Sequence, residues 1–449
     1  MSRRALVAIL GSLCLPSCLE PPKPLPTPDA GASEGVAGGD EGEEGEGEGE
    51  GEGDAAAEEQ EERGELEEEG GEGEGGEGEG EGEGEGEGEG EGEGEGEGEG
   101  GPAESEPPVP RQAFFNFPRS DADEDRTLED KVIELVDRAL PGSTIHVSLY
   151  GFTRRRAAEA FVRAHQRGVV VSMVLDGGVA NQAAWPILQA GLPAASLSLC
   201  GSSEHTSCLG NGINHSKFYL LSALDDGSTD VVVQSSANLT REMLRQHNNL
   251  VVVRGDSSLY QGYLDVWHDQ RAQVQDLDYY RTVVGDGPVR SYFFPRASGD
   301  TVVSVLHHVV CSAGSRVRVA MSLFTDSRID IAAALAERAR EGCDVQVLLK
   351  HNDTMPGAEV LSLLQESEVS LALFQASDAR ATVHSKVLLI DSAYDTGSGA
   401  SWRRLVFTGS HNWTGPALRA NDEQLLRIDD GEVFAAFDAN LDAIAATAP

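Results

Sequence analysis

The chain has 449 residues and a formal net charge of −43. The charge is unevenly distributed, because 36 of the 77 acidic and 5 of the 34 basic residues precede Gln112, which leaves 41 acidic and 29 basic residues, a net charge of −12, in the rest. A broadly basic surface for nonspecific nucleic-acid binding is therefore excluded for that part, which leaves room only for a local basic groove.

Residues 1–18 are predicted to be an export signal. Arg3 and Arg4 precede an apolar run from Ala5 to Leu15 that is too short to span a membrane permanently. Leu15-Pro16-Ser17-Cys18 resembles a bacterial lipobox, in which Cys18 would carry the lipid. A plain secretory signal cut nearby is the alternative. The chain is thus expected to be exported, either lipid-anchored in the bacterial cell envelope or secreted.

Residues 19–110 are predicted to form a disordered acidic tether. The segment is rich in Gly, Glu and Pro and has almost no apolar side chains to offset its ordering entropy. Its like charges repel one another, so an extended and solvated chain is expected. Beyond the signal there is no second apolar stretch long enough to span a bilayer, and no integral membrane domain is expected.

The remaining chain is predicted to be a duplicated α/β domain with halves at 112–285 and 286–449. Phe115-Asn116-Phe117-Pro118-Arg119 matches Tyr292-Phe293-Phe294-Pro295-Arg296, and Gly142–Tyr150 matches Gly314–Phe324. Strands are predicted at 145–152, 169–175, 317–324 and 345–349, and helices at 157–166 and 329–340. This alternation predicts parallel β-α-β units, a sheet covered on both faces, and two halves packed about a pseudo-twofold axis.

Each half carries the same polar motif late in its sequence. Asn214-His215-Ser216-Lys217 precedes Ser235-Ser236-Ala237-Asn238, and Val383-His384-Ser385-Lys386 precedes Gly409-Ser410-His411-Asn412. Apolar flanks place each His-x-Lys on a strand, at 213–221 and 383–390, where a period of two points both side chains to one face. An imidazole beside an ammonium, present twice, suits a phosphate site with two histidines.

Four cysteines lie beyond the signal region. An even number in an exported chain predicts disulfides, and four cysteines allow three pairings. We favour one bond within each half, Cys200–Cys208 and Cys311–Cys343, with buried free thiols as the alternative. No Cys-x-x-Cys or His-x-x-x-His spacing indicates a structural metal, and no cofactor is predicted.

The two polar motifs resemble the phospholipase D superfamily, whose pattern is His-x-Lys-x4-Asp, then Gly-Ser-x-Asn, then an acidic residue. The resemblance covers Phe114 to about Ala443. The second copy matches the pattern at His384, Lys386, Asp391, Gly409, Ser410, Asn412 and Glu423. The first copy matches at His215, Lys217, Ser236 and Asn238, and departs from it at Ser222, Ser235 and Asn249. Asn249 is aligned with Glu423 because each follows its motif Asn at the same spacing.

The resemblance implies a phosphoric diester hydrolase with a covalent phosphohistidine intermediate. One His attacks phosphorus and the other protonates the leaving alkoxide. By resemblance His215 is the nucleophile, His384 is the acid, and Glu423 holds His215. Asn249 is expected near His384, and Asp391 is expected to have a structural role at a strand end. The lysines, asparagines and serines of both motifs would bind the phosphate oxygens without a metal.

Three functions stay open at this point. The first is hydrolysis of phospholipid headgroup esters by a monomer attached to the membrane through its N-terminal lipid. The second is a nuclease of the same fold acting on DNA or RNA, which the acidic composition disfavours. The third is a non-catalytic surface module that binds phosphate, and only Ser222 and Asn249 support it. A phosphatidyl transferase is a variant of the first, disfavoured by the missing membrane spans.

Overall fold

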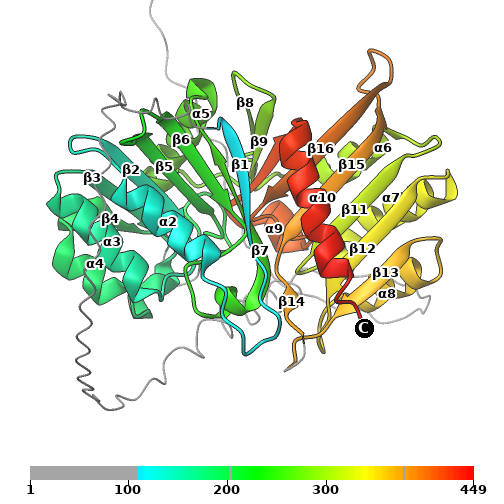
Figure 1. Ribbon diagram of the computed structural model, residues 1–449, viewed down its shortest axis with the longest axis horizontal. Coiled ribbons are helices and arrows are strands. Elements are labelled where there is room, and N and C mark those ends of the chain that lie inside the picture. The colour runs from blue at the N-terminus through cyan, green and yellow to red at the C-terminus, as the bar shows by residue number, and fades with distance from the viewer. Residues whose placement is uncertain (1–108, 202–204, 378–379) are drawn as a thin grey trace, which may run out of the picture. The chain divides into compact units, whose positions relative to one another are not determined.

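The computed structural model describes residues 109–201, 205–377 and 380–449 (Figure 1). The predicted export signal, Cys18 and nearly all of the predicted tether lie outside the described residues. Within the described ranges no helix is both long enough and apolar enough to cross a membrane.

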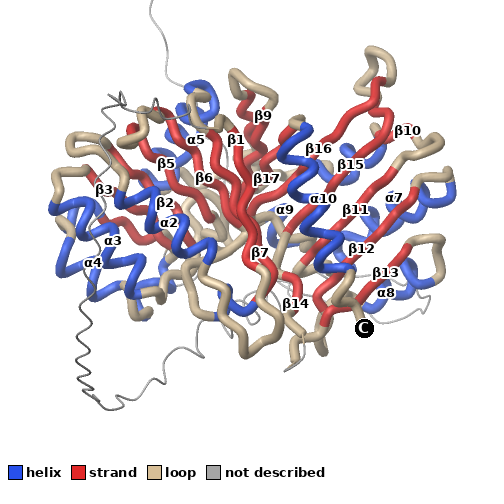
Figure 2. Tube along the Cα trace, in the orientation of Figure 1, coloured by secondary structure: helices blue, strands red, loops and turns tan. Residues whose placement is uncertain are grey.

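The first sheet is built mainly from the first half of the folded chain, with strand order β1-β7-β6-β5-β2-β3-β4. Its strands are β1 (Arg111–Asn116), β2 (Thr144–Leu149), β3 (Val170–Leu175), β4 (Leu197–Leu199), β5 (Lys217–Ala223), β6 (Thr229–Ser235) and β7 (Gln246–Val253). β14 (Thr382–Val383), from the second half, adds to this sheet by pairing with β7. A strand of the second half therefore extends the first sheet, at the junction visible in Figure 2.

The second sheet has strand order β13-β12-β11-β15-β16-β17-β9-β8, with β10 paired to β15. Its strands are β8 (Arg281–Val284), β9 (Val289–Phe294), β10 (Val309–Val310), β11 (Arg316–Met321), β12 (Asp344–Lys350), β13 (Ser370–Phe374), β15 (Lys386–Tyr394), β16 (Ser401–Gly409) and β17 (Glu423–Ile428). The predicted parallel pairing holds for β2-β3-β4 and β11-β12-β13. No pairing was predicted for β5-β6-β7 and β15-β16-β17, which are antiparallel neighbours because the chain turns back between consecutive strands.

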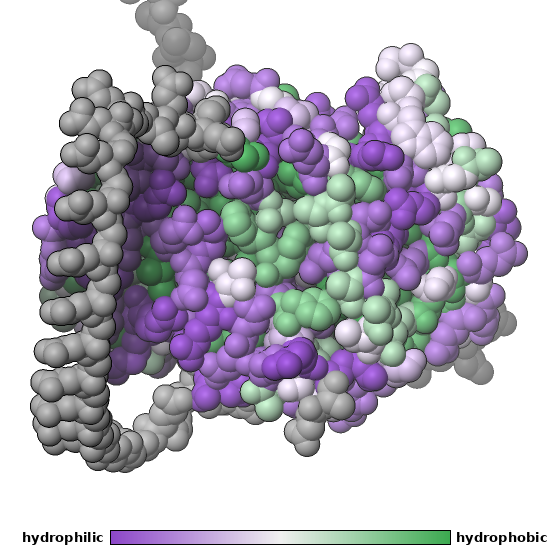
Figure 3. All heavy atoms as spheres, viewed as in Figure 1, coloured by the Kyte–Doolittle hydropathy of each residue, from purple (hydrophilic) through white to green (hydrophobic). Residues whose placement is uncertain are grey.

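Helices cover the outer face of each sheet and fill the space between the sheets. They are α2 (Thr127–Asp137), α3 (Arg155–Gln166), α4 (Trp185–Gly191), α5 (Ser257–Ala272), α6 (Thr301–His307), α7 (Ile329–Arg340), α8 (Ala358–Gln365), α9 (Gly415–Arg419) and α10 (Gly431–Ala445). One core joins α2, α3 and α4 to the first sheet, and another joins α6, α7 and α8 to the second. The third core combines α5 and α10 with side chains of both sheets. In Figure 3 pale apolar groups gather over α10, whose outward side carries small alanines.

The duplication is visible in the local backbone as well as in the topology. The predicted helix at 329–340 coincides with α7, and the one at 157–166 lies within α3. Each of these helices is followed by a glycine in the left-handed region, Gly168 and Gly342, both with φ of +96°. A side chain is strained in that conformation, so glycine ends both helices and turns the chain into the next strand. Both favoured disulfides, Cys200–Cys208 and Cys311–Cys343, are present in the structure.

Candidate active site

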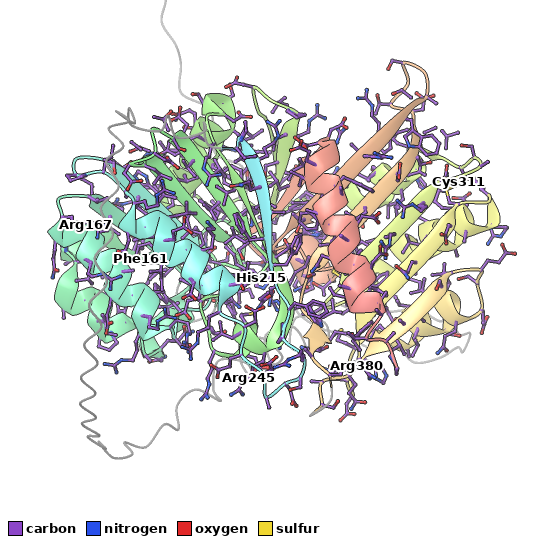
Figure 4. The ribbon with its side chains drawn as sticks, in the orientation of Figure 1. Phe161, Arg167, His215, Arg245, Cys311 and Arg380 are labelled. Carbon is purple, nitrogen blue, oxygen red and sulfur yellow. A yellow bond between two sulfur atoms is a disulfide. The ribbon has the colours of Figure 1, made fainter. Side chains whose placement is uncertain are left out.

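Each His-x-Lys motif contacts the opposite half of the chain, His215 through Glu423 and His384 through Asn248, and Figure 4 shows His215 at the junction of the halves. β5 begins at Lys217 and β15 begins at Lys386, so the histidines lie in the extended segments just before these strands rather than on them. Both imidazoles are buried, with exposed fractions of 0% for His215 and 1% for His384. The motifs are therefore inside the molecule, where electrostatic interactions are stronger than in water.

The imidazole of His215 is held by a carboxylate from the other half. Nδ1 of His215 lies 2.8 Å from Oε1 of Glu423, at the start of β17. Ser410 donates its hydroxyl to the other oxygen of Glu423, and the amide of Asn421 approaches Oε1 at 3.4 Å. A carboxylate accepts the Nδ1 proton, so in the neutral ring Nε2 is the unprotonated nitrogen. This placement of Glu423 against His215 is the one that the family resemblance implies.

The imidazole of His384 is held by an amide instead. Nδ1 of His384 lies 2.8 Å from Oδ1 of Asn248, which also accepts a 3.0 Å hydrogen bond from Ser236. The NH2 group of Asn248 donates to the carbonyls of Met243 and Gln246 at 3.2 and 3.3 Å. Because those bonds fix the amide, its oxygen faces His384 and can accept a hydrogen bond from Nδ1.

The expectation that Asn249 lies beside His384 is wrong by one residue. The side chain of Asn249 points elsewhere and accepts a 2.7 Å hydrogen bond from Thr408. Its backbone pairs with Ser236 as the backbone of Gln424 pairs with Ser410, so Asn249 is equivalent to Gln424. The loop before β7 is one residue shorter than the loop before β17, and a one-residue shift along a strand moves a side chain to the other face. Aligning the apolar runs that begin at Leu250 and Leu425 would have found Asn248.

Each motif lysine stays beside its own histidine. Nζ of Lys217 donates to the carbonyl of His215 at 3.1 Å, and Nζ of Lys386 donates to the carbonyl of His384 at 3.0 Å. Lys386 also lies 3.0 Å from Nε2 of His384, and Lys217 lies 5.5 Å from the ring centre of Tyr150. Both lysines are buried, where electrostatic interactions are stronger than in water. The pair of lysines therefore places two positive charges in the site.

The motif asparagines follow β6 and β16 in equivalent positions. Asn238 accepts a hydrogen bond from the backbone of Gly151 at 3.3 Å, and Asn412 is completely buried. The residue after each asparagine, Leu239 or Trp413, forms a β-bridge to the loop that follows β2 or β11. The same backbone frame thus carries an amide beside each histidine motif.

Asp391 lies away from the histidines. It is inside β15, five residues past Lys386, which corresponds to about 16 Å along a strand. Its carboxylate accepts hydrogen bonds from Trp402 at 2.6 Å and Arg316 at 3.2 Å. The structural interpretation of Asp391 agrees with these contacts, whereas its expected position at a strand end is wrong.

Two buried histidines next to the site have no role predicted from the sequence. His411 lies between Ser410 and Asn412, and burial together with Arg328 holds its pKa well below the ordinary value. Burial lowers the pKa of His247 to about 4, so this side chain is neutral at pH 7. The carbonyl of His247 accepts hydrogen bonds from the backbone and hydroxyl of the His384 motif. No motif identifies either residue, because His411 is the variable position of Ser-x-Asn and His247 lies outside both motifs.

Comparison with known families identifies the architecture. A family model described as the phospholipase D-like domain of cardiolipin synthase matches residues 132–267 and 306–445, which together exceed half of the chain. The chain belongs to the phospholipase D-like family. One match lies in each half, so the duplication is that of a phospholipase D-like protein with two copies of the domain. Membership supports a phosphodiesterase and does not separate hydrolysis from phosphatidyl transfer.

One of three similar solved structures supports the same fold. A phosphatidylserine synthase from Haemophilus influenzae Rd KW20 is 13% identical, with a TM-score of 0.50 over 76% of this chain and 88% of that one. A polyphosphate kinase from Porphyromonas gingivalis is 10% identical over 74% of this chain, which spans only 50% of the kinase, with a TM-score of 0.49. The phospholipase D family member Nuc from Salmonella typhimurium is 22% identical over 36% of this chain and 95% of its own, with a TM-score of 0.28. A search of curated protein sequences found no significant match.

A metal centre is not indicated by the described part of the chain. Its one group of three potential ligands with suitable spacing is Cys200, Cys208 and Asp422. The two sulfurs are already joined to each other, so they have no thiolate to offer a metal ion.

Proposed function

We propose that this phospholipase D-like protein hydrolyses phospholipid headgroup esters through a phosphohistidine on His215. The observation that carries the proposal is the difference between the partners of the two imidazoles. Glu423 can orient His215 and stabilise the positive charge that the imidazole of His215 acquires on phosphorylation. Asn248 orients His384 without adding negative charge, so a protonated His384 gives its proton to the leaving oxygen more easily.

The reaction proceeds in two displacements. Nε2 of His215 attacks phosphorus, the bond from phosphorus to the leaving oxygen breaks, and His384 gives its proton to that oxygen. Water then attacks the phosphohistidine, gives a proton to His384 and releases the phosphomonoester as the phosphorus–nitrogen bond breaks. Lys217 and Lys386 stabilise the negative oxygens of both transition states, with Asn238 and Asn412 as hydrogen-bond donors.

Charge favours a lipid over a nucleic acid as the substrate. A headgroup ester presents one phosphodiester, whereas DNA presents a row of phosphates that a net charge of −12 repels. Lipidation at Cys18 would keep the enzyme at a membrane. The tether predicted at 19–110 would, for about 90 flexible residues, have a reach on the order of 50 Å, enough to let the folded part reach the lipid surface.

The substrate is tested by parallel turnover of phosphatidylcholine, cardiolipin and single-stranded DNA, each with and without EDTA. Release of the headgroup alcohol, unaffected by EDTA, is expected from at least one lipid. Faster cleavage of DNA would replace the lipid proposal by a nuclease, and inhibition by EDTA would contradict the metal-independent mechanism. Binding of all three without turnover would identify a non-catalytic module.

The anchor is tested separately by cell fractionation. Replacing Cys18 by Ser removes the acyl chains, so the protein is expected to move from the membrane fraction to the soluble fraction. Deleting residues 19–110 is expected to leave turnover of a soluble substrate unchanged, because the site lies entirely in later residues. Membrane association that survives Cys18→Ser would place the anchor in the folded part.

A further inference from the structure

A loop of the first half is hydrogen-bonded to the segment that directly precedes Glu423. We call this contact the clasp, and it consists of Cys208–Ile213 in the first half and Ala420–Asp422 in the second. The backbone N–H groups of Asn211 and Gly212 donate to the carbonyl of Ala420 at 3.0 and 3.1 Å. The backbone N–H of Asp422 donates to the carbonyl of Ile213 at 3.0 Å. The clasp therefore joins the halves through directional bonds beside the active site.

The carboxylate of Asp422 is the centre of the clasp. It is fully buried and accepts hydrogen bonds from the backbone of Cys208, Leu209 and Gly210 at 2.8, 3.0 and 2.9 Å. Burial raises the pKa of Asp422 to about 6, against the opposing effect of these backbone donors. Removing the carboxylate would leave several buried N–H groups without an acceptor, which is destabilising.

The fit of the clasp requires glycine at position 210. A Cβ at Gly210 would lie 1.7 Å from the carbonyl oxygen of Ala420, whereas a Cβ at Gly212 would meet the side-chain oxygen of Asn421 at 2.2 Å, an atom that can move. The backbones of the two halves therefore approach each other most closely at Gly210. A small displacement of the loop would therefore move Ala420–Asp422, and with it the adjacent Glu423.

The clasp is fastened to the first sheet by a disulfide. Cys208, its first residue, is bonded to Cys200, which directly follows β4 and donates its backbone N–H to Leu175 of β3 at 2.8 Å. Both sulfurs are buried. The path from the first sheet to the carboxylate on His215 thus runs through Cys200, Cys208, Asp422 and Glu423.

We propose that Asp422 is a positioning residue for Glu423, and that the Cys200–Cys208 disulfide is required to keep it in place. The enzyme then reaches full activity only after oxidation of these cysteines, as in an oxidising compartment outside the cytoplasm. This inference rests on the proposed function for its catalytic consequence, although not for the geometry of the clasp. In the reduced state the loop gains freedom, and the carboxylate loses its fixed position against His215.

The chemistry is thiol–disulfide exchange. A dithiol reductant gives two electrons and two protons, the sulfur–sulfur bond breaks, and Cys200 and Cys208 become thiols while the reductant closes to its own disulfide. The other disulfide, Cys311–Cys343, provides a matched control. It joins the residue after β10 to the residue before β12, and Figure 4 shows Cys311 at the far edge of the second half, away from His215.

The test uses the full-length protein carrying Cys311→Ala and Cys343→Ala, so that dithiothreitol acts on the clasp disulfide among the described cysteines. Hydrogen exchange is followed by mass spectrometry before and after reduction, with circular dichroism as the check on folding. Faster exchange in the peptide containing residues 420–424, in the half opposite to the reduced cysteines, is expected. Unchanged exchange there after complete reduction would overturn the proposal, whatever the activity.

Activity on bis(p-nitrophenyl) phosphate provides the second measurement. Reduction, or Asp422→Asn in the oxidised protein, is expected to lower kcat about tenfold and leave KM within about twofold, because Glu423 does not bind substrate. In a Glu423→Gln background the same changes are expected to have little further effect, since they act through that carboxylate. Full additivity with Glu423→Gln would overturn the positioning role. An untreated protein without turnover would count against the proposed function alone, since exchange still tests the clasp.

Discussion

Ser236 in the first half donates its hydroxyl to Asn248, whereas Ser410 in the second half donates to Glu423. The backbone around the two serines is the same, and each partner then contacts the histidine of the opposite half. The two halves therefore share the same backbone arrangement and differ in the charge of the side chain that contacts Nδ1 of each histidine. A symmetric fold has acquired an asymmetric site by the exchange of a carboxylate for an amide.

This difference suggests how a duplicated domain can divide two roles. A nucleophile benefits from a carboxylate that stabilises the charge of the phosphorylated ring, and an acid benefits from a neutral partner that does not retain its proton. If both histidines had carboxylates, both would bind their protons tightly. The comparison makes the roles of the histidines testable one at a time.

The largest effect is expected from removing either imidazole. His215→Ala and His384→Ala should each lower turnover by about two orders of magnitude or more, because one loses the nucleophile and the other the acid. His307→Ala is the matched control, since that side chain is exposed on α6, and it should retain full turnover. Substantial activity in either site variant would show that the two halves do not need each other.

The second prediction separates the roles by trapping the intermediate. His215→Asn should abolish labelling of the protein by a phosphodiester substrate in rapid-quench experiments, because no nucleophile remains. His384→Asn should slow labelling by substrates with poor leaving groups and spare nitrophenyl esters, which need little protonation. Label recovered on His384 would reverse the assignment of the two halves.

A smaller effect is expected from making the two halves alike. Asn248→Asp would place a carboxylate against Nδ1 of His384, as Glu423 stands against His215. The proton of His384 would then be held more tightly, so turnover of alkyl phosphodiesters should fall about tenfold while nitrophenyl esters change little. Asn249→Asp is the control, because its side chain contacts Thr408 rather than His384. An equal loss for both substrate types would point to misfolding instead of a weakened acid, and thermal unfolding would check that.

Much of the fold was predictable because the repeat could be read twice. The helix at 329–340, the glycines that end α3 and α7, and the pairing of cysteines within each half all follow from local pattern and from the duplication. The antiparallel half of each sheet was missed, since apolar strands have the same pattern in either direction. The insertion of β14 into the other half's sheet has no local signal, because it depends on how the halves pack.

The site was predictable to within one residue, and the error is instructive. His215 and Glu423 meet as the family pattern implies, while Asn248 replaces the expected Asn249 because a loop is shorter in one copy. Counting residues cannot locate such a deletion, whereas the start of an apolar strand can. Asp422 was not noticed at all, since its role depends on backbone donors more than 200 residues away in sequence.

The smallest effect is expected where the first half departs from the family pattern without touching the site. Ser222 stands where Asp391 stands in the second half, and its hydroxyl accepts a 2.9 Å hydrogen bond from the backbone of Thr144. In the second half Arg316 takes the position of Thr144 and forms an ion pair with Asp391, so this ion pair has no equivalent at Ser222. Ser222→Asp restores the pattern without that partner, and turnover should stay within about twofold of the wild type because the site is several residues away along β5. A clear gain in kcat would mean that this position acts on Lys217 or His215 through the strand, and that the first half is weakened by Ser222 rather than specialised by Asn248.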